Sequence, residues 1–390
     1  MTILAVLIQE RIERTPDGNF WVQSPSDYRY YSQFQDVFPM VRILARTSNV
    51  NEPSRAASRL DGAGVGVMPL TDIRGLGSTL FNLRLYRHQL SIGFEGCQAA
   101  ILRVPFFLSD LATIIIKKMG IPFGADVVGD SWDALSSGSG IGGALRPVMR
   151  RVFRSTQRRT CCRATCARYV TRRALQIRYP CPGPQFASSD AMLGPDAFAV
   201  ETRPFPRTRP LHLISVGTLE TLYKAPDIQI ESVRLLRDMG IDVRLTLVGD
   251  GKRRDELKAL AVKRGVDDAV VFKGRLPPGQ AIREELDKAH IFIMPSLAEG
   301  LPRSLLEAMA RGMPCVGTSV GGIVELLPET DLVPPRNAKA LANRIAEIAK
   351  DQSWWVRSAN HNLTVSRDYG EACVQGILKE FLICLHDRMR

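Results

Sequence analysis

The sequence has little cysteine and no long hydrophobic run, and each absence excludes a class of protein. Eight cysteines in 390 residues are too few for a disulfide scaffold, and the opening segment lacks the basic residues of an export signal. The longest apolar stretch, from Val104 to Ile116, contains an aspartate and ends at two lysines, so it is well short of the ~20 residues that span a bilayer. We therefore expect a cytoplasmic protein without a transmembrane helix.

Two patterns of metal ligands are also missing. Cys161, Cys162, Cys166 and Cys181 lie close together in the sequence, but their spacing matches no pair of zinc-binding knuckles. No Asp-x-Asp triplet, which could hold a divalent metal beside a diphosphate, occurs in the chain. The sequence therefore predicts no metal site.

What is present is an ordinary globular composition with one cationic segment. The chain is 45% hydrophobic and 24% charged, which suits two folded domains. Of its net charge of +12, eleven charges come from one segment, 145–179, which has neither lysine nor acid. Such a segment binds phosphate in anionic lipid, nucleic acid or a phosphorylated substrate, or is only a solvated helix face. Its arginines are at positions 146, 150, 151, 154, 158, 159, 163, 168, 172, 173 and 178.

Apolar residues at helical spacings accompany the first of these arginines. This pattern is typical of a helix that lies on a membrane surface. Nucleic-acid binding would need more interleaved aromatic residues than Phe153 and Tyr169 provide. We therefore predict an anionic membrane surface as partner of arginines 146–178, and no nucleic acid. The apolar residues are Leu145, Val148, Met149, Val152 and Phe153.

From residue 211 onward, short apolar runs alternate with helical segments. This alternation implies right-handed crossovers and a parallel sheet covered by helices on both faces, so we predict a doubly wound α/β domain. The predicted strands are 212–216, 243–248, 269–272, 290–294 and 314–316, and the predicted helices are about 226–239, 252–264, 278–288, 302–311 and 337–350.

The first half alternates less regularly, with apolar runs at 3–8, 41–45, 64–68, 125–128 and 167–171. A second α/β domain is expected there. Seven prolines between residues 179 and 210 mark a linker, because helices and interior strands do not tolerate this density. The last segment, from 368 to 385, is helical in pattern, and no sheet signal precedes it over 352–367.

Glycine-bearing turns follow three strands of the second half, where open parallel sheets bind ligands. Gly217 and Thr218 open the first turn, which leads to Lys224, and Gly249 opens the second. The third runs from 295 to 300. Glycine lets the backbone approach a diphosphate and a lysine can neutralise it, although glycines also simply turn corners.

Two glutamates bracket the predicted helix at 302–311. Glu299 lies in the loop before it, and Glu307 lies roughly 7–8 Å along the axis. The start of a helix binds phosphate, whereas carboxylates accept hydrogen bonds from hydroxyls. A diphosphate with hydroxyls on both sides is a nucleotide sugar, with its sugar at Glu299 and its ribose at Glu307. The alternative is that Glu299 caps the helix and Glu307 pairs with Arg303 or Arg311 on the surface.

The motif Pro295-Ser296-(2)-Glu299-Gly300-Leu301-Pro302-(4)-Glu307-Ala308-Met309-Ala310-(1)-Gly312 resembles the donor domain of the retaining family 4 glycosyltransferases. Segments 248–251 before it and 321–325 after it share the resemblance, which is dense over about 211–350. It implies the GT-B architecture, in which two Rossmann-like doubly wound domains face each other across a cleft. Residues 1–195 would then bind the acceptor and 196–367 the nucleotide sugar, and a final helix, 368–390, would cross back to the first domain.

The resemblance also implies roles for individual residues. Glu299 would contact the donor sugar or its phosphates, Glu307 the ribose and Lys224 the diphosphate. The backbone of Gly300, Leu301, Pro302 and Arg303 would contact the sugar and diphosphate, and residues near Phe272 and Lys273 would contact the base.

The sequence departs from the family pattern in both halves. Thr218 stands where the family commonly has an arginine, so phosphate neutralisation depends more on Lys224, with Arg303 as a substitute. In place of a frequent histidine in the first domain there are Asp130 and Asp133, which either orient the acceptor or cap the next helix. Gly18, after the first strand, resembles the glycine loop near the donor phosphates.

We expect metal-independent, retaining transfer of a sugar from a nucleotide diphosphate sugar to a lipid-linked glycan acceptor, with no cofactor. The enzyme would act in cell-surface polysaccharide assembly as a peripheral protein at the inner membrane face. Charge on the leaving nucleoside diphosphate would be stabilised by Lys224, the helix start at Pro302 and Arg303. The alternatives are a sugar-nucleotide 2-epimerase of similar architecture and a nucleic-acid or membrane-binding module that has lost its chemistry.

Overall fold

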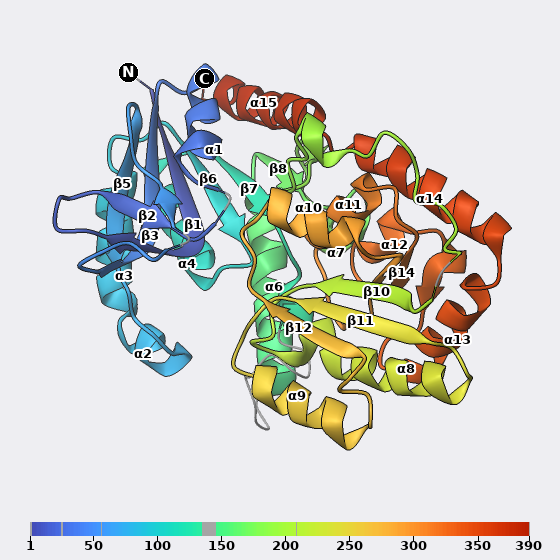
Figure 1. The fold of residues 1–390 in the computed structure, drawn as a ribbon. Helices are drawn as coiled ribbons and strands as arrows, with labels where there is room; N and C mark the ends of the chain where they lie inside the picture. The colour runs from blue at the N-terminus through green and yellow to red at the C-terminus, as the bar shows by residue number, and fades with distance from the viewer. Residues whose placement is uncertain (1, 25, 56, 135–145, 208, 390) are drawn as a thin grey trace. The chain divides into compact units, whose positions relative to one another are not determined.

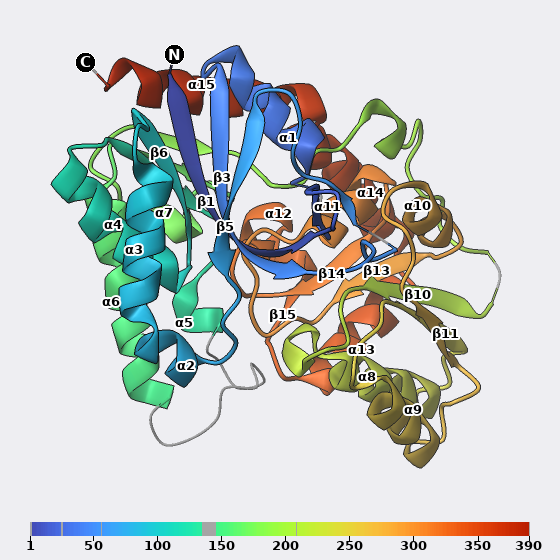
Figure 2. The ribbon, with the colours of Figure 1, turned by 90° about the vertical axis from the view of Figure 1, so that its left-hand side faces the viewer.

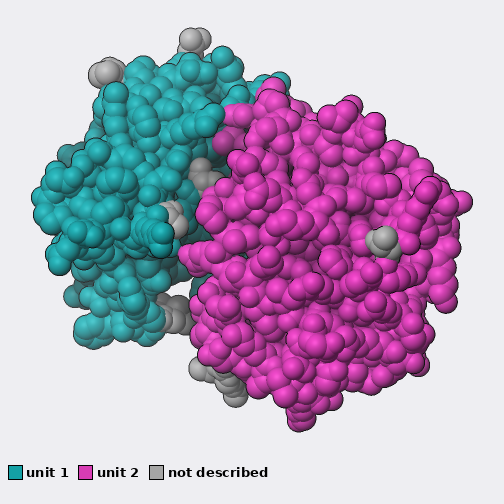
Figure 3. Space-filling view, viewed as in Figure 1, with its two compact units in different colours: residues 1–131, 151–188, 375–390 teal, residues 132–150, 189–374 magenta. Residues whose placement is uncertain are grey.

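The structure is a computed structural model that describes residues 2–389 except 25, 56, 135–145 and 208. Its contacts divide the chain into two compact units (Figure 3). The domain boundaries predicted after residues 195 and 367 stay predictions, because contact density alone does not define a domain. The first unit contains Met1–Ser131, Arg151–Ser188 and Gln375–Arg390, and the second contains Trp132–Arg150 and Ser189–Val374.

The first unit is built on a sheet whose parallel strands have the order β5-β3-β1-β6-β7-β8-β9. Strands β2 and β4 extend β1 in antiparallel pairing. The order reverses between β1 and β6, and this is where Rossmann-like sheets bind ligands. The strands are β1 Ile3–Arg14, β2 Phe20–Val22, β3 Met40–Asn49, β4 Ser58–Arg59, β5 Val65–Thr71, β6 Ala99–Val104, β7 Phe123–Val127, β8 Cys166–Tyr169 and β9 Gln185–Ala187.

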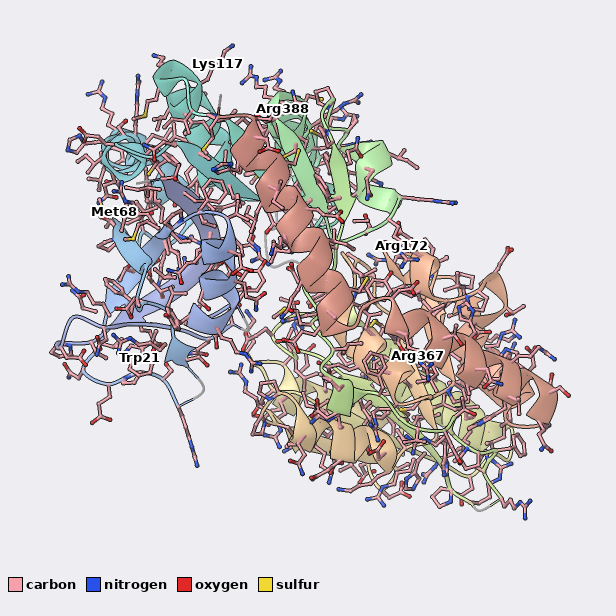
Figure 4. The ribbon with its side chains drawn as sticks, turned by 90° about the horizontal axis from the view of Figure 1, so that it is seen from above. Trp21, Met68, Lys117, Arg172, Arg367 and Arg388 are labelled. Carbon is pink, nitrogen blue, oxygen red and sulfur yellow. The ribbon has the colours of Figure 1, made fainter. Side chains whose placement is uncertain are left out.

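Helices cover both faces of this sheet. Three of them, α3 Leu83–Phe94, α4 Phe107–Met119 and α6 Arg146–Arg163, gather on the face turned toward the viewer in Figure 2. On the opposite face, Phe381 of α15 (Glu371–Asp387) packs against Gly124, with its ring 5.9 Å from that of Phe186. Figure 4 shows the end of α15, near the labelled Arg388, over the strands of this unit. The shorter helices are α1 Tyr28–Ser32, η1 Gln33–Asp36, α2 Leu76–Phe81, α5 Ser131–Ala134 and α7 Ala174–Arg178.

The second unit contains a fully parallel sheet with the order β12-β11-β10-β13-β14-β15. Here the order reverses between β10 and β13. The inner strands β13 and β14 are fully buried because helices cover both faces of the sheet, as Figure 1 shows for α8 and α13 on one side and α11 and α14 on the other. The strands are β10 Leu211–Val216, β11 Val243–Val248, β12 Val270–Gly274, β13 Ile291–Met294, β14 Cys315–Thr318 and β15 Leu332–Val333.

Local sequence signals explain where the helices of this unit begin. Pro226 occupies the first turn of α8, where a missing N–H has no cost. The side chains of Asn337 and Asp351 accept hydrogen bonds from the backbone N–H groups of Ala340 and Trp354, each over 2.8 Å, and so cap α13 and α14. The helices are η2 Pro195–Ala197, η3 Leu222–Lys224, α8 Pro226–Asp238, α9 Arg254–Lys263, α10 Gln280–Asp287, α11 Arg303–Ala310, α12 Ile323–Leu326, η4 Glu329–Asp331, α13 Ala338–Ile348 and α14 Gln352–Arg367.

The predicted fold class, two doubly wound α/β units, is confirmed, and each predicted strand of the first half overlaps an observed one, although the prediction is incomplete. The first strand continues past residue 8 to Arg14, and strand β6 is absent from the prediction. Part of the predicted linker, Gln185–Ala187, is an edge strand, where the neighbouring prolines cost no ladder hydrogen bond. Within the part of the chain that is described, no helix combines the length and the apolar character needed to cross a bilayer.

Candidate functional site

The point where the second sheet reverses its order brings Lys224 and Glu299 together. Lys224 follows β10 and Glu299 follows β13, and these two strands are neighbours in the sheet. The Lys224 Nζ lies 2.6 Å from the Glu299 Oε1, and the two side chains are only 14% and 8% exposed. A shielded lysine and carboxylate therefore meet where a Rossmann-like sheet binds its ligand.

Tyr223 holds this pair in place. Its ring centroid lies 5.2 Å from the Lys224 Nζ, and its carbonyl accepts a 2.7 Å hydrogen bond from the N–H of Leu297 in the opposite loop. Burial acts to lower the pKa of Lys224, but the Glu299 carboxylate and its hydrogen bond outweigh burial and raise that pKa above its ordinary value. The lysine is thus a fixed cation. Sequence analysis missed Tyr223, although it directly precedes Lys224.

Helix α11 begins beside this pair with its first turn uncapped by any side chain. Pro302, predicted as its first residue, instead precedes it in an extended conformation. The loop before α11 is held by Gly321 and Gly322, because the N–H of Gly322 donates to the carbonyl of Gly300 over 2.7 Å. A Cβ atom on Gly321 would lie 1.9 Å from the Glu299 carbonyl oxygen, so only glycine fits there.

Glu307 is partly buried in α11 without a partner. Within the described residues, its carboxylate has no hydrogen bond or ion pair, and the predicted alternative of a surface pair is wrong. Arg311 pairs with Asp287 at 2.8 Å instead, and Arg303 is exposed. Burial raises the pKa of Glu307, although nearby arginines oppose the shift. A carboxylate in this state is available to hydroxyl groups of a ligand.

The glycine turns after β10, β11 and β12 interlock. The N–H of Gly249 donates to the carbonyl of Gly274 over 2.9 Å, and a Cβ atom on Gly249 would lie 1.8 Å from the Gly217 carbonyl oxygen. Thr218 accepts a hydrogen bond from the backbone of its own turn. Phe272 is partly buried nearby, whereas the ammonium group of Lys273 lies 3.2 Å from Glu285. Three turns thus form one backbone surface at this edge of the sheet.

Of the site residues predicted in the first half, Gly18 and Asp130 belong to the first unit and Asp133 to the second. Gly18 lies in a tight turn after β1, where its N–H donates to the Thr15 carbonyl over 2.9 Å. The buried carboxylate of Asp130 contacts the Arg178 guanidinium and the Tyr179 hydroxyl. The side chain of Asp133 lies outside the described residues. The acceptor-orienting roles of both aspartates stay predictions.

The arginines of segment 146–178 do not form one surface, so the prediction that all of them face a membrane is wrong. Arg168 is 1% exposed in β8 and forms a 2.8 Å ion pair with Asp126. Arg178 contacts Asp130, and the guanidinium of Arg150 stacks 3.9 Å from the Trp132 ring centroid. The outward face of α6 keeps Arg151, Arg158, Arg159 and Arg163 exposed, while Leu145 lies outside the described residues.

The cysteines are free thiols, and most of the crowded ones are buried. Burial raises the pKa values of Cys161, Cys166 and Cys181, so these thiols stay protonated at neutral pH. Among the residues that the structure describes, no group of three or more His, Cys, Asp and Glu side chains could hold a metal ion.

Comparison with known proteins finds similarity in the segment that contains Lys224, Glu299 and Glu307. Residues 202–363 match the family model of glycosyl transferases group 1. The protein CapJ of Staphylococcus aureus is 24% identical over 82% of this chain and 79% of its own length. The putative colanic acid biosynthesis glycosyltransferase WcaL of Escherichia coli is 36% identical over 44% of this chain and 43% of its own length.

Solved structures share the fold of the whole chain. Sucrose-phosphate synthase from Thermosynechococcus elongatus matches with a TM-score of 0.71 at 16% identity and covers 100% of both chains. HepE of Anabaena in complex with UDP and glucose matches with a TM-score of 0.64 at 15% identity over 97% of this chain and 99% of its own. The fold is therefore that of the GT-B glycosyltransferases, and residues 202–363, which contain Lys224, Glu299 and Glu307, carry the pattern of glycosyl transferases group 1.

Proposed function

We propose that the protein is a retaining, metal-independent glycosyltransferase that uses a nucleotide diphosphate sugar as donor. The observation that carries the proposal is the geometry at the reversal point of the second sheet. A fixed lysine, an uncapped helix start and an unpartnered glutamate lie there within the segment that matches group 1 glycosyl transferases. HepE, with the same fold, is described in complex with UDP and glucose, which supports the choice of donor class.

In this proposal the bond between the anomeric carbon and the donor phosphate breaks while the acceptor hydroxyl forms a new bond to that carbon. The acceptor proton passes to the departing phosphate oxygen. Lys224 and the N–H groups at the start of α11 stabilise the charge on the leaving nucleoside diphosphate, with Arg303 as a further cation. Glu299 orients Lys224 and accepts from a sugar hydroxyl, and Glu307 accepts from the ribose. Neither glutamate is the nucleophile.

The first test is incubation of the protein with UDP-, GDP- and dTDP-sugars in the presence of EDTA. We expect slow release of the nucleoside diphosphate by hydrolysis. Formation of a 2-epimer would instead support the epimerase, and loss of turnover with EDTA would contradict metal independence. The nucleotide sugar that the protein hydrolyses is then titrated by calorimetry. Glu307→Ala should weaken its binding at least tenfold, whereas the control Glu347→Ala, which changes an exposed glutamate on α13, should leave binding unchanged. Equal affinity of both variants for every donor would refute the donor site.

We further propose that the acceptor is a lipid-linked glycan of cell-surface polysaccharide assembly. WcaL of Escherichia coli and AmsK of Erwinia amylovora are named as colanic acid and amylovoran biosynthesis glycosyltransferases, which supports this acceptor class. The exposed face of α6 supports peripheral binding to an anionic membrane, because Val148 and Val152 are 57% and 53% exposed among basic residues. Those residues are Arg151, Arg158, Arg159 and Arg163.

Vesicle co-sedimentation tests this membrane contact. Replacing these four arginines with glutamine should abolish binding to vesicles that contain anionic lipid, and added salt should weaken the binding of the unmodified protein. A variant that loses the same charge elsewhere serves as control, and undiminished binding of the arginine variant would contradict the contact. The control replaces Lys252, Lys258, Lys263 and Lys339, which are exposed in the second unit.

A further inference from the structure

A second group of cations lies beside the point where the first sheet reverses its order. Arg11 on β1 and Arg46 on β3 stand in register after an irregularity in the pairing of these strands. Phe106 lies two residues after β6, the strand on the other side of the reversal, and its ring centroid lies 4.9 Å from the Arg46 guanidinium carbon. Two arginines therefore meet where a Rossmann-like sheet binds a ligand, in a unit for which the donor site provides no role.

Arg46 has no counter-charge of its own. Its Nη2 donates to the carbonyl of Gln9 over 2.7 Å, but its Nε is buried without a partner. Within the described residues no carboxylate lies within ion-pair distance of it. Burial, followed by the charge of Arg11, lowers the pKa of Arg46. A partly buried charge without an ion-pair partner is costly, so an incoming anion would stabilise this arrangement.

The neighbouring acids are already engaged. The carboxylate of Asp72 lies 2.7 Å from Arg11 and 3.5 Å from Arg74, so one acid serves two guanidinium groups. Glu10 lies 3.5 Å from Arg103 instead. The hydroxyl of the buried Tyr86 donates to the Thr71 carbonyl over 2.8 Å and carries no charge, because burial raises its pKa. The cluster of Arg11, Arg46 and Arg74 with Asp72 thus has an excess of positive charge.

We propose that Arg11 and Arg46 bind an oxyanion of the acceptor, either a phosphate ester or a sugar carboxylate. Arg11 is 44% exposed, so a ligand can reach the pair from solvent. The Nε of Arg46 has no partner in the protein, and two neighbouring guanidinium groups can bind a planar or tetrahedral oxyanion through several charge-assisted hydrogen bonds. The assignment to the acceptor rests on the proposed glycosyltransferase function, whereas the anion site itself does not. It predicts that neutral glycans are poor acceptors.

Calorimetric titration of the full chain at constant ionic strength tests the anion site. The probes are glucose 1-phosphate, glucuronic acid and glucose. We expect saturable binding of at least one anion and none of glucose. Arg46→Gln should weaken anion binding about tenfold or more, and Arg46→Lys should restore part of it, because lysine keeps the charge and loses the fork. Arg74→Gln, at a side chain that is 78% exposed, should stay within about twofold of the unmodified protein.

Each outcome decides the proposal. Binding of glucose 1-phosphate alone identifies a phosphorylated acceptor, and binding of glucuronic acid identifies an acidic sugar. Persistence of either in Lys224→Gln shows that the donor site is not responsible. No saturable binding of either anion, or equal affinity in Arg46→Gln, would overturn the proposal. If Arg46→Gln fails to fold, Arg11→Gln at the more exposed position gives the same readout. Donor hydrolysis by the unmodified protein is measured separately, so failure of the donor site is distinguished from failure of the anion site.

Discussion

The Lys224 and Glu299 pair provides the sharpest test of the donor site, through the stability of the chain without any ligand. The two charged atoms are 2.6 Å apart, and both side chains are almost fully shielded. Removing one partner leaves the other as a shielded charge without compensation, which costs about 3–5 kcal/mol. For a unit of this size, each kcal/mol lowers the melting temperature by about 2–4 °C. Glu299→Gln should therefore melt roughly 6–20 °C below the unmodified protein.

The double variant decides whether this loss comes from the pair. Lys224→Met with Glu299→Gln removes both charges, so it should recover most of the stability that either single change loses. Because the folded-state pKa of Lys224 is raised above its ordinary 10.5, the stabilisation is present in full at neutral pH and is lost only as the pH rises through that raised value. Scanning calorimetry of the three variants measures the coupling. Losses that simply add in the double variant would refute the reasoning.

Three further predictions concern the second unit. Burial raises the pKa of Glu307 above its ordinary 4.5, so donor affinity measured by calorimetry should fall as the pH is lowered through this raised pKa. Glu307→Gln should remove this pH dependence of donor affinity. Burial, with His212 nearby, lowers the pKa of His290 to about 4, so thermal stability should fall by about 1–2 kcal/mol between pH 6.5 and 4, allowing for solvent screening, and stay level in His290→Asn. Gly321→Ala should abolish donor binding, whereas Gly240→Ala, which shares a positive φ but meets no atom within 4 Å, should only lower stability by about 1 kcal/mol.

Five strands of the second sheet were predicted to within two residues at each end, because most of their residues are apolar and buried, whereas the short strand β15 was not predicted. Strand β11, for example, has the predicted bounds Val243–Val248. The first sheet is different. Strand β6 contains the charged Arg103 and ends at Val104, where the predicted apolar stretch begins, so its signal merges with that of α4. Helix α14 was not predicted because its sequence has few charged residues and shows neither a clear strand pattern nor a clear helix pattern.

The same contrast applies to the sites. Lys224, Glu299 and Glu307 stand at recognisable distances from strand ends, so their meeting follows from the order of the strands. Arg11 and Arg46 meet only because of the register between β1 and β3. An irregularity shifts this register, and no residue in either strand predicts it. Engagement of Asp130 by Arg178 and Tyr179 depends on tertiary packing in the same way.

The packing of Phe381 against Gly124 has a consequence for biosynthesis. The first unit begins with the earliest strands to leave the ribosome, yet residues 375–390 complete its hydrophobic interior. Until the ribosome has translated the second unit, helix α15 is not available to pack on the surface around Gly124 and Phe186. The first unit of the nascent polypeptide therefore stays incomplete during this interval, and chaperones that recognise apolar patches should bind it.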